Sequence, residues 1–252
     1  MRPSSTSIGA VAIAIAAAAA AATSLSAVAG PAGASSTAAS TYTAALKAAA
    51  THDVHFASMA TQQGTSISVI GDTGMTSGSQ TLTVRKGKSN ETLSVMLVAG
   101  TGYVKGNTAG LVQILGLGAA LGAKYGGKWL SFPTSDANLA GLVNGLQAKD
   151  VPTELKITAP LTFGTTKSVN GQSATAIKGT VGASATTQVP VVLYVASSGT
   201  PYPLEEVTNP SKSAGKKGIY ATVIFTQWGE KTHEKAPAHS TSLLSLAAPT
   251  SG

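Results

Sequence analysis

Apolar side chains alternate with small or polar ones in Val54-His55-Phe56-Ala57-Ser58-Met59. The same alternation returns in Ile67-Ser68-Val69 and in Thr81-Leu82-Thr83-Val84, and a further strand of this kind is expected around Leu93–Leu97. A period of two residues is typical of strands that bury one face. Glycines at short intervals between these runs indicate hairpin turns. The sequence therefore predicts an antiparallel meander.

The period changes to that of a helix on either side of this meander. Tyr42–Ala50 is rich in alanine and predicts a short helix before it. After it, Asn107–Lys124 carries apolar residues three and four positions apart, which predicts one amphipathic helix. Ser135 or Asp136 can cap a second helix, with an apolar stripe along Leu139–Leu146.

The C-terminal part returns to strands. Asn170-Gly171 is a strong hairpin signal, and further strands are expected at Ala174–Lys178, Val189–Val195, Pro203–Thr208 and Tyr220–Thr226. Strands, then helices, then strands indicate an α+β domain with an antiparallel sheet.

The first 34 residues have the features of a secretory signal peptide. Arg2 precedes an apolar run, Ile8–Ala22, and two A-x-A cleavage sites follow, at Ala27–Ala29 and Ala32–Ala34. We expect cleavage after Ala29 or Ala34, the alternative being an uncleaved N-terminal anchor. We therefore expect a secreted protein at the exterior of the cell envelope.

The composition excludes several classes of function. Only 11% of the 252 residues are charged, with 17 basic and 10 acidic side chains, and there is no cysteine. Disulfides, thiol catalysis, cysteine-bound zinc and iron–sulfur clusters are thereby excluded. The net charge of +7 is spread over single lysines without an arginine cluster, which argues against a nucleic-acid partner.

Two patterns that suggest a ligand have simpler interpretations. The run Gly116–Gly122 resembles a dinucleotide loop, but it lies inside an apolar helical pattern and does not follow a strand. His52 and His55 fall where a strand begins, which would point them to opposite faces and away from a shared metal. We expect no cofactor and no metal site.

Catalytic motifs are equally weak. Ser213-Ala214-Gly215-Lys216 has the S-x-x-K spacing of serine acyltransferases without their partner motifs. Glu205 and Glu206 are adjacent on a predicted strand and would face opposite sides of it. With so few His, Asp and Glu residues for acid–base chemistry, we expect a protein that is not an enzyme; an envelope hydrolase is the least favoured alternative.

Four stretches in a fixed order resemble a known family. They are Gly102–Asn107; Gly127–Pro133; Val191–Ala196 with Ser198–Leu204; and Phe225–Glu230 leading to Ala236-Pro237. Together they resemble the actinobacterial envelope lipoproteins of the LppX and LprG type. The resemblance covers the chain from about Thr51 to Pro237.

This resemblance implies a half-barrel, in which a curved antiparallel sheet wraps around helices that cover its concave face, as in periplasmic lipoprotein carriers. It further implies binding of an acylated lipid or glycolipid in an apolar cavity between sheet and helices. Members of that family begin with a lipidated cysteine, which this sequence lacks. We therefore expect a diffusible lipid binder without a lipid anchor.

The domain organisation expected from these observations is simple. Residues 1–34 form the signal peptide, 35–50 a linker with a short helix, 51–237 one half-barrel domain, and 238–252 a disordered tail. The predicted lipid-binding residues share the apolar faces of the strands and helices: Val69, Leu82, Val84, Leu93, Val95, Leu97, Leu111, Ile114, Leu115, Leu139, Leu142, Val143 and Leu193.

The apolar stripes also fit a filled core. In that case the chain would be a secreted β-rich adhesion or cell-wall-binding module. Its positive charge would then favour contact with anionic envelope surfaces.

Overall fold

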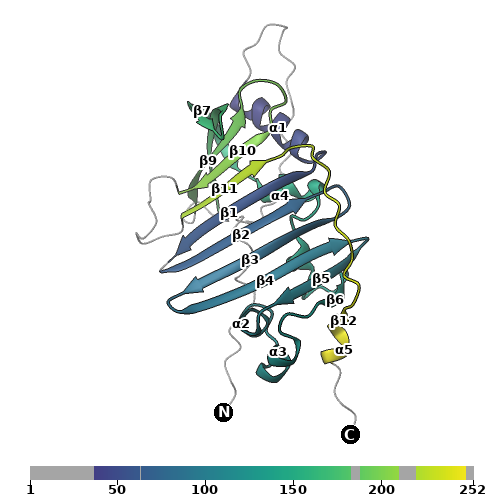
Figure 1. Cartoon of the computed structure of the whole chain (residues 1–252). Helices are drawn as coiled ribbons and strands as arrows, with labels where there is room; N and C mark the ends of the chain where they lie inside the picture. Colours follow the sequence, from purple (N-terminus) through teal and green to yellow (C-terminus); the bar gives the residue numbers. More distant parts are fainter. Residues whose placement is uncertain (1–36, 63, 183–187, 210–219, 248–252) are drawn as a thin grey trace.

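A twelve-stranded sheet organises the part of the chain that the structure describes (Figure 1). The computed structural model describes residues 37–62, 64–182, 188–209 and 220–247. The strands are β1 (Val54–Gln62), β2 (Thr65–Thr73), β3 (Gly78–Lys86), β4 (Ser89–Val98), β5 (Thr101–Gly106), β6 (Leu130–Pro133), β7 (Thr158–Val169), β8 (Gln172–Val181), β9 (Val189–Ala196), β10 (Pro203–Thr208), β11 (Tyr220–Thr226) and β12 (Thr241–Ser242). The helices are α1 (Ala38–Ala49), α2 (Thr108–Gln113), α3 (Ala119–Tyr125), α4 (Val151–Glu154), α5 (Leu244–Ala247) and the 3₁₀ turns η2 (Ala140–Val143) and η3 (Ala148–Asp150).

The sheet is built from two meanders that meet in its middle. Its order is β12-β6-β5-β4-β3-β2-β1-β11-β10-β9-β8-β7, and all neighbours are antiparallel except β12 and β6, which are parallel. In the first meander β1 to β5 follow one another, and in the second β7 to β11 do so. The junction is the pair β1 and β11, in which Phe56 lies opposite Phe225. The sheet is open and curved, so the predicted α+β half-barrel is confirmed.

The alternation seen in the sequence decides which face of the sheet is buried. In β4, Leu93, Val95 and Leu97 are buried while the residues between them are partly exposed, as expected from the alternating pattern. The Asn170-Gly171 hairpin is also confirmed, since both residues have positive φ, 49° and 82°. Most of the predicted strands form, and most of their large apolar residues lie on the buried face, with Met59 of β1 and Ile70 of β2 as exposed exceptions.

Short segments cover this concave face. Helix α1 lies against β7, β10 and α4, helix α2 against β4 and β5, and η2 against β4. In Figure 1, α1 and α4 lie behind the β9–β11 end of the sheet, and α2 and α3 lie near the β4–β5 end. In the described part of the chain no helix has the length and apolar character needed to cross a bilayer.

The prediction of one helix over Asn107–Lys124 is wrong. The chain forms α2, then leaves the helical conformation at Gly116, whose φ is +77°, and re-enters it at α3. A left-handed residue ends a helix because the backbone hydrogen-bond ladder cannot continue through it. Leu111 and Ile114 are nevertheless buried on α2 and just after it.

The second predicted helix is also wrong. The segment after Asp136 forms only η2, and Asp136 accepts a hydrogen bond from the Asn138 backbone N–H instead of capping an α-helix. Gly145, with φ of +75°, turns the chain away before a longer helix can form.

Two predictions concern the ends of the chain: an N-terminal signal peptide and a disordered C-terminal tail. The predicted signal peptide lies outside the described residues. The tail, predicted to be disordered from residue 238, instead adds β12 and α5, and Leu243 between them is buried. This part of the prediction is wrong because a sequence rich in Ser, Thr and Ala is ordered here by pairing with β6.

Candidate functional site

The concave face brings the predicted lipid-binding residues together in one apolar cluster. Nine of them are buried members of this cluster: Val69, Leu82, Leu93, Val95, Leu97, Leu111, Ile114, Val143 and Leu193. Four pack against it and are half-buried: Val84, Leu115, Leu139 and Leu142. Contact of these side chains with a lipid stays a prediction.

Directly opposed residues trace a row across this face. Leu193 lies opposite Glu206, Glu206 opposite Val223, and Val223 opposite Ser58. The row continues from Ser58 through Val69, Leu82 and Leu93. Because opposed residues point to the same side of a sheet, this row forms an apolar floor that Glu206 and Ser58 interrupt.

Hydrogen bonds from the floor hold part of the cover. Gln80 is buried, and its Nε2 donates to the Leu142 carbonyl of η2 at 3.1 Å. Thr73 donates through Oγ1 to the Gly145 carbonyl at 2.7 Å. These two side chains attach the segment around η2 to the edge of the apolar floor.

Tyr42 of α1 holds the other part of the cover. Its hydroxyl donates to the Leu155 carbonyl at 2.8 Å and accepts from the Ile157 N–H at 2.7 Å. Burial raises the pKa of this hydroxyl, with a smaller contribution from the charge of Glu206. One phenol thus joins α1 to the chain that leaves α4.

Glu206 is the notable polar group of the floor. It is 5% exposed, lies among members of the apolar cluster, and burial raises the pKa of its carboxyl to about 7, with Glu154 raising it further. The neighbouring Glu205 faces the other side of β10 and forms an ion pair with Lys167. The expectation that these two carboxylates face opposite sides is therefore confirmed.

Sequence reasoning did not identify Glu206, Tyr42, Gln80 or Ser58 as parts of this face. The alternation within β10 places Glu206 and Glu205 on opposite faces, but it does not say which of the two faces the core. That follows only from the pairing of Glu206 with Leu193 and Val223.

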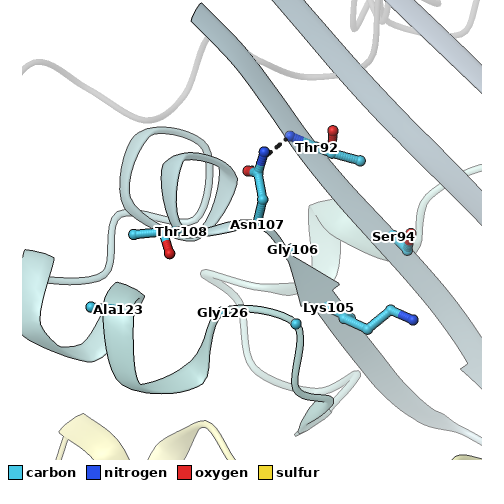
Figure 2. Close-up of a pocket in the computed structure, with 9 residues that line it drawn as sticks. Thr92, Ser94, Lys105, Gly106, Asn107, Thr108, Ala123 and Gly126 are labelled. Atoms are coloured by element: carbon cyan, nitrogen blue, oxygen red, sulfur yellow. Dashed lines mark hydrogen bonds between the residues drawn. The ribbon is translucent and has the colours of Figure 1, made fainter.

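A hollow lies outside this face, at the start of α2 (Figure 2). It has a volume of about 510 Å³ and is lined by Ser94 and Lys105 on the strand side and by Thr108 and Gly126 on the helical side. The Asn107 side chain is already engaged: its Oδ1 accepts from the backbone N–H groups of Gly110 and Thr92, and its Nδ2 donates to the Asn90 carbonyl. Asn107 therefore serves the structure of this hollow.

The residues considered for metal binding or catalysis do not assemble into a centre. His55 pairs with Asp72 at 2.9 Å, while His52 lies against the Ala48 carbonyl and the Tyr202 ring. Over the described ranges, no group of three or more histidine and acidic side chains is placed to hold a metal ion. The S-x-x-K segment from Ser213 to Lys216 lies outside the described residues.

No family model matches the sequence, and no curated protein matches it either. Solved structures do resemble the fold. LprF from Mycobacterium bovis has a TM-score of 0.50 and 15% identity, over 80% of this chain and 97% of that one. The lipoprotein LppX from Mycobacterium tuberculosis has a TM-score of 0.47 and 16% identity, over 78% of this chain and 97% of that one.

A protein from Thermus thermophilus, described as an uncharacterized conserved protein, has a TM-score of 0.42 and 10% identity, over 82% of this chain and 98% of that one. At these identities the likeness concerns the fold alone. The open curved sheet, with its apolar concave face under short helical segments, is thus the half-barrel fold found in LprF.

Proposed function

We propose that this protein binds the acyl chains of a lipid or glycolipid against its concave face, without catalysis, for carriage or scavenging at the cell envelope. The observation that carries the proposal is that the apolar floor is broad, whereas the helices that cover it are short. The floor runs across the sheet from β9 to β4, whereas the longest helix in the described residues, α1, has 12 residues.

The physical reason is that short covering segments can be replaced by ligand. An acyl chain gains roughly 0.8 kcal/mol for each buried CH₂ group, so a sixteen-carbon chain gains on the order of 10 kcal/mol before ordering costs. No polar contact is needed for this gain. The segment around η2 is tied to the sheet by a few hydrogen bonds, such as that of Gln80, so moving it would break few polar contacts.

The resemblance of four sequence stretches to the LppX and LprG type of lipoproteins supports the same function. The half-barrel fold shared with LprF agrees with it. The signal-peptide features of residues 1–34 support secretion, and the net charge of +7 supports proximity to an anionic envelope surface.

Binding can be tested with the protein purified without detergent. Native mass spectrometry should detect a co-purifying lipid, or saturable one-to-one binding of added fatty acids. Affinity should rise roughly tenfold for every two CH₂ groups, because each group adds burial. Absence of any bound lipid, of saturation and of a chain-length dependence would reject the proposal. Salt-sensitive binding to cell walls without lipid uptake would then support the filled adhesion module.

A matched pair of variants distinguishes the two faces of the sheet. Val84 is half-buried on the concave face, and Ile70 is 54% exposed on the other face. Val84→Asp should weaken fatty-acid binding by about tenfold or more, since it places a charge beside the acyl chain. Ile70→Asp should leave binding unchanged. Equal effects of the two variants would contradict a site on the concave face.

A further inference from the structure

The positive charge of this protein is concentrated in one stretch of the chain. Residues 85–128 contain six of the 17 basic residues but only one of the 10 acidic residues, Glu91, so they carry +5 of the net charge of +7. The basic residues of this stretch are Arg85, Lys86, Lys88, Lys105, Lys124 and Lys128. The rest of the chain is therefore close to neutral.

The fold gathers this stretch at one end of the molecule. Asn107, at the start of α2, bonds through its side chain to the backbone of Asn90 and Thr92 in β4, close to the β3–β4 turn. Helix α3 packs on α2, and the Gly127 N–H that follows α3 donates to the Gly106 carbonyl at 2.8 Å. In Figure 1, α2 and α3 lie at the lower end of the view, beside β4 and β5.

Three of the lysines surround two aromatic rings at this end. The Lys105 ammonium lies 4.8 Å from the centre of the Trp129 ring, and those of Lys124 and Lys128 lie 5.4 Å and 5.8 Å from the centre of the Tyr125 ring. The ion pairs found among the described residues lie elsewhere and involve none of these lysines. These five residues, here named the basic patch, thus hold three positive charges that no described carboxylate pairs with.

The C-terminal segment adds an apolar side chain to the same end. The Thr241 N–H donates to the Trp129 carbonyl at 3.1 Å, and a hollow of about 460 Å³ lies between Trp129 and residues 237–241. Three positions after Thr241, Leu244 of α5 is 47% exposed. This end of the molecule therefore presents aromatic and aliphatic side chains among its cations.

We propose that the basic patch, together with Leu244, docks this end of the protein on a bilayer that contains anionic lipids. Lysines near such a surface are attracted to its negative potential. Tryptophan and tyrosine rings suit the boundary between headgroups and acyl chains, and an exposed leucine can enter that boundary. A soluble polyanion would engage the lysines but offers no apolar layer for Leu244, so the observations favour a lipid surface.

Docking at this end also brings the apolar floor close to a source of lipid. Lys105 precedes Gly106, which lies opposite Leu93 at the β4 end of the floor, and α2 covers this end. An acyl chain that leaves the bilayer would therefore meet α2 first. This last step rests on the lipid-binding function proposed above, whereas docking itself does not require it.

The test measures co-sedimentation of the protein with vesicles of phosphatidylcholine, with and without phosphatidylglycerol. The anionic vesicles should bind about tenfold more tightly or better, and high salt should remove most of this preference. A signal peptide left on the chain would bind to both kinds of vesicle, so the difference between them is the readout. Equal affinity for both kinds of vesicle would overturn the proposal.

A matched pair of triple variants assigns the preference to the basic patch. The first replaces its three lysines by glutamine and should reduce the preference about tenfold or more. The second removes the same charge from exposed lysines of α1, η3 and β8 and should keep the preference within about threefold; its substitutions are Lys47→Gln, Lys149→Gln and Lys178→Gln. Equal losses would mean that overall charge, and not this patch, causes binding.

A second pair of variants separates a lipid surface from a soluble polyanion. Leu244→Ser should weaken binding to the anionic vesicles about threefold or more, because a side chain that enters the bilayer is lost, and leave binding of polyphosphate unchanged. Ile70→Ser, at a 54% exposed position of β2, is the control and should keep vesicle binding. If Leu244→Ser binds the vesicles as tightly as the unaltered protein does, the lipid surface is the wrong partner.

Docking and lipid carriage fail in different ways. If fatty acids bind but the protein does not distinguish the two kinds of vesicle, only the docking proposal is wrong. If the basic patch directs the protein to anionic vesicles and no fatty acid binds, docking stands and lipid carriage is wrong. The comparison of vesicles on the unaltered protein gives this answer even if a variant does not fold.

Discussion

Glu205 and Glu206 are adjacent and chemically identical, yet their side chains have very different surroundings. The first forms an ion pair with Lys167, whose ammonium also lies 3.9 Å from the centre of the Tyr194 ring. The second lies under the cover among apolar residues, and burial raises the pKa of its carboxyl to about 7. Adjacent residues of a strand point to opposite faces, so two chemically identical side chains lie in different surroundings.

The first prediction concerns the pH dependence of stability. The pKa of Glu206 is about 7 in the folded protein, against an ordinary value of 4.5. As pH rises from about 4.5 to 7, the unfolded state therefore releases a proton that the folded state retains, and the free energy of unfolding falls by roughly 3 kcal/mol. Urea unfolding of the unaltered protein at pH 5 and pH 8 measures this fall.

Glu206→Gln should remove most of this fall, and it should be more stable than the unaltered protein at pH 8. A smaller decrease remains, because the pKa values of Glu154 and Asp150 are also raised. Glu205→Gln is the control and should keep the full pH dependence. Parallel pH profiles for Glu206→Gln and the unaltered protein would contradict the buried state of this carboxyl.

The second prediction concerns Tyr42. Tyr42→Phe keeps the ring but removes the hydroxyl that pairs with the Leu155 carbonyl and the Ile157 N–H. Two buried backbone groups then lose their partner, which should lower the free energy of unfolding by roughly 2 to 4 kcal/mol. Tyr103→Phe, at a half-buried position of β5, is the control and should change stability little. If Tyr42→Phe and Tyr103→Phe lower the free energy of unfolding equally in chemical denaturation, the hydrogen bonds of the Tyr42 hydroxyl do not stabilise the fold.

At the scale of elements, caps and turns decide where the helices end. The Thr37 side chain caps α1 together with Ser40, and Asn107 caps α2. Gly116 ends the helical path after α2, so the apolar pattern of 107–124 is divided between two short helices. The lipid binding proposed above needs a cover that ligand can displace, and short helices are easier to displace than one long helix.

The third prediction follows from the cap of α2. Asn107→Ala removes the acceptor for the Gly110 and Thr92 N–H groups and the donor to the Asn90 carbonyl. We expect a loss of about 1 to 2 kcal/mol, measured by thermal or urea unfolding. Asn138→Ala, at an exposed position without a cap, should stay within about 0.5 kcal/mol of the unaltered protein. A neutral Asn107→Ala would mean that α2 does not depend on this side chain.

At the scale of the whole molecule, distant parts of the chain are joined through one sheet. Strand β11 joins the two halves of the sheet by pairing with β1 in its middle, and β12 adds a parallel neighbour to β6 at one end (Figure 1). Leu243, just after β12, is buried against the common core, whereas the adjacent Leu244 is 47% exposed. The C-terminal segment is therefore part of the domain.

The fourth prediction uses this adjacent pair. Leu243→Ala should lower the free energy of unfolding by about 2 to 4 kcal/mol, because it leaves a cavity in the core. Leu244→Ala should change it by less than about 0.5 kcal/mol. Both are measured by chemical denaturation. If the two substitutions have the same effect, β12 and its flanking residues do not belong to the folded core.

Part of this protein could be predicted from local patterns. The alternation in 54–59, 67–69 and 81–84 predicted the strands, and Asn170-Gly171 predicted a hairpin. These features depend on neighbours in the sequence. The helical segments were predicted less well, because an apolar pattern with a period near 3.6 does not show that Gly116 and Gly145 adopt positive φ and end the helices.

The tertiary structure alone decided the rest. The pairing of β1 with β11 joins residues about 170 positions apart, and the pairing of β12 with β6 orders a tail whose composition predicts disorder. Glu206 became a buried carboxyl of the floor because β9 and β11 place Leu193 and Val223 opposite it. The physical reason is that local periodicity specifies the face of a strand, whereas burial and protonation depend on the partners that long-range pairing brings to that face.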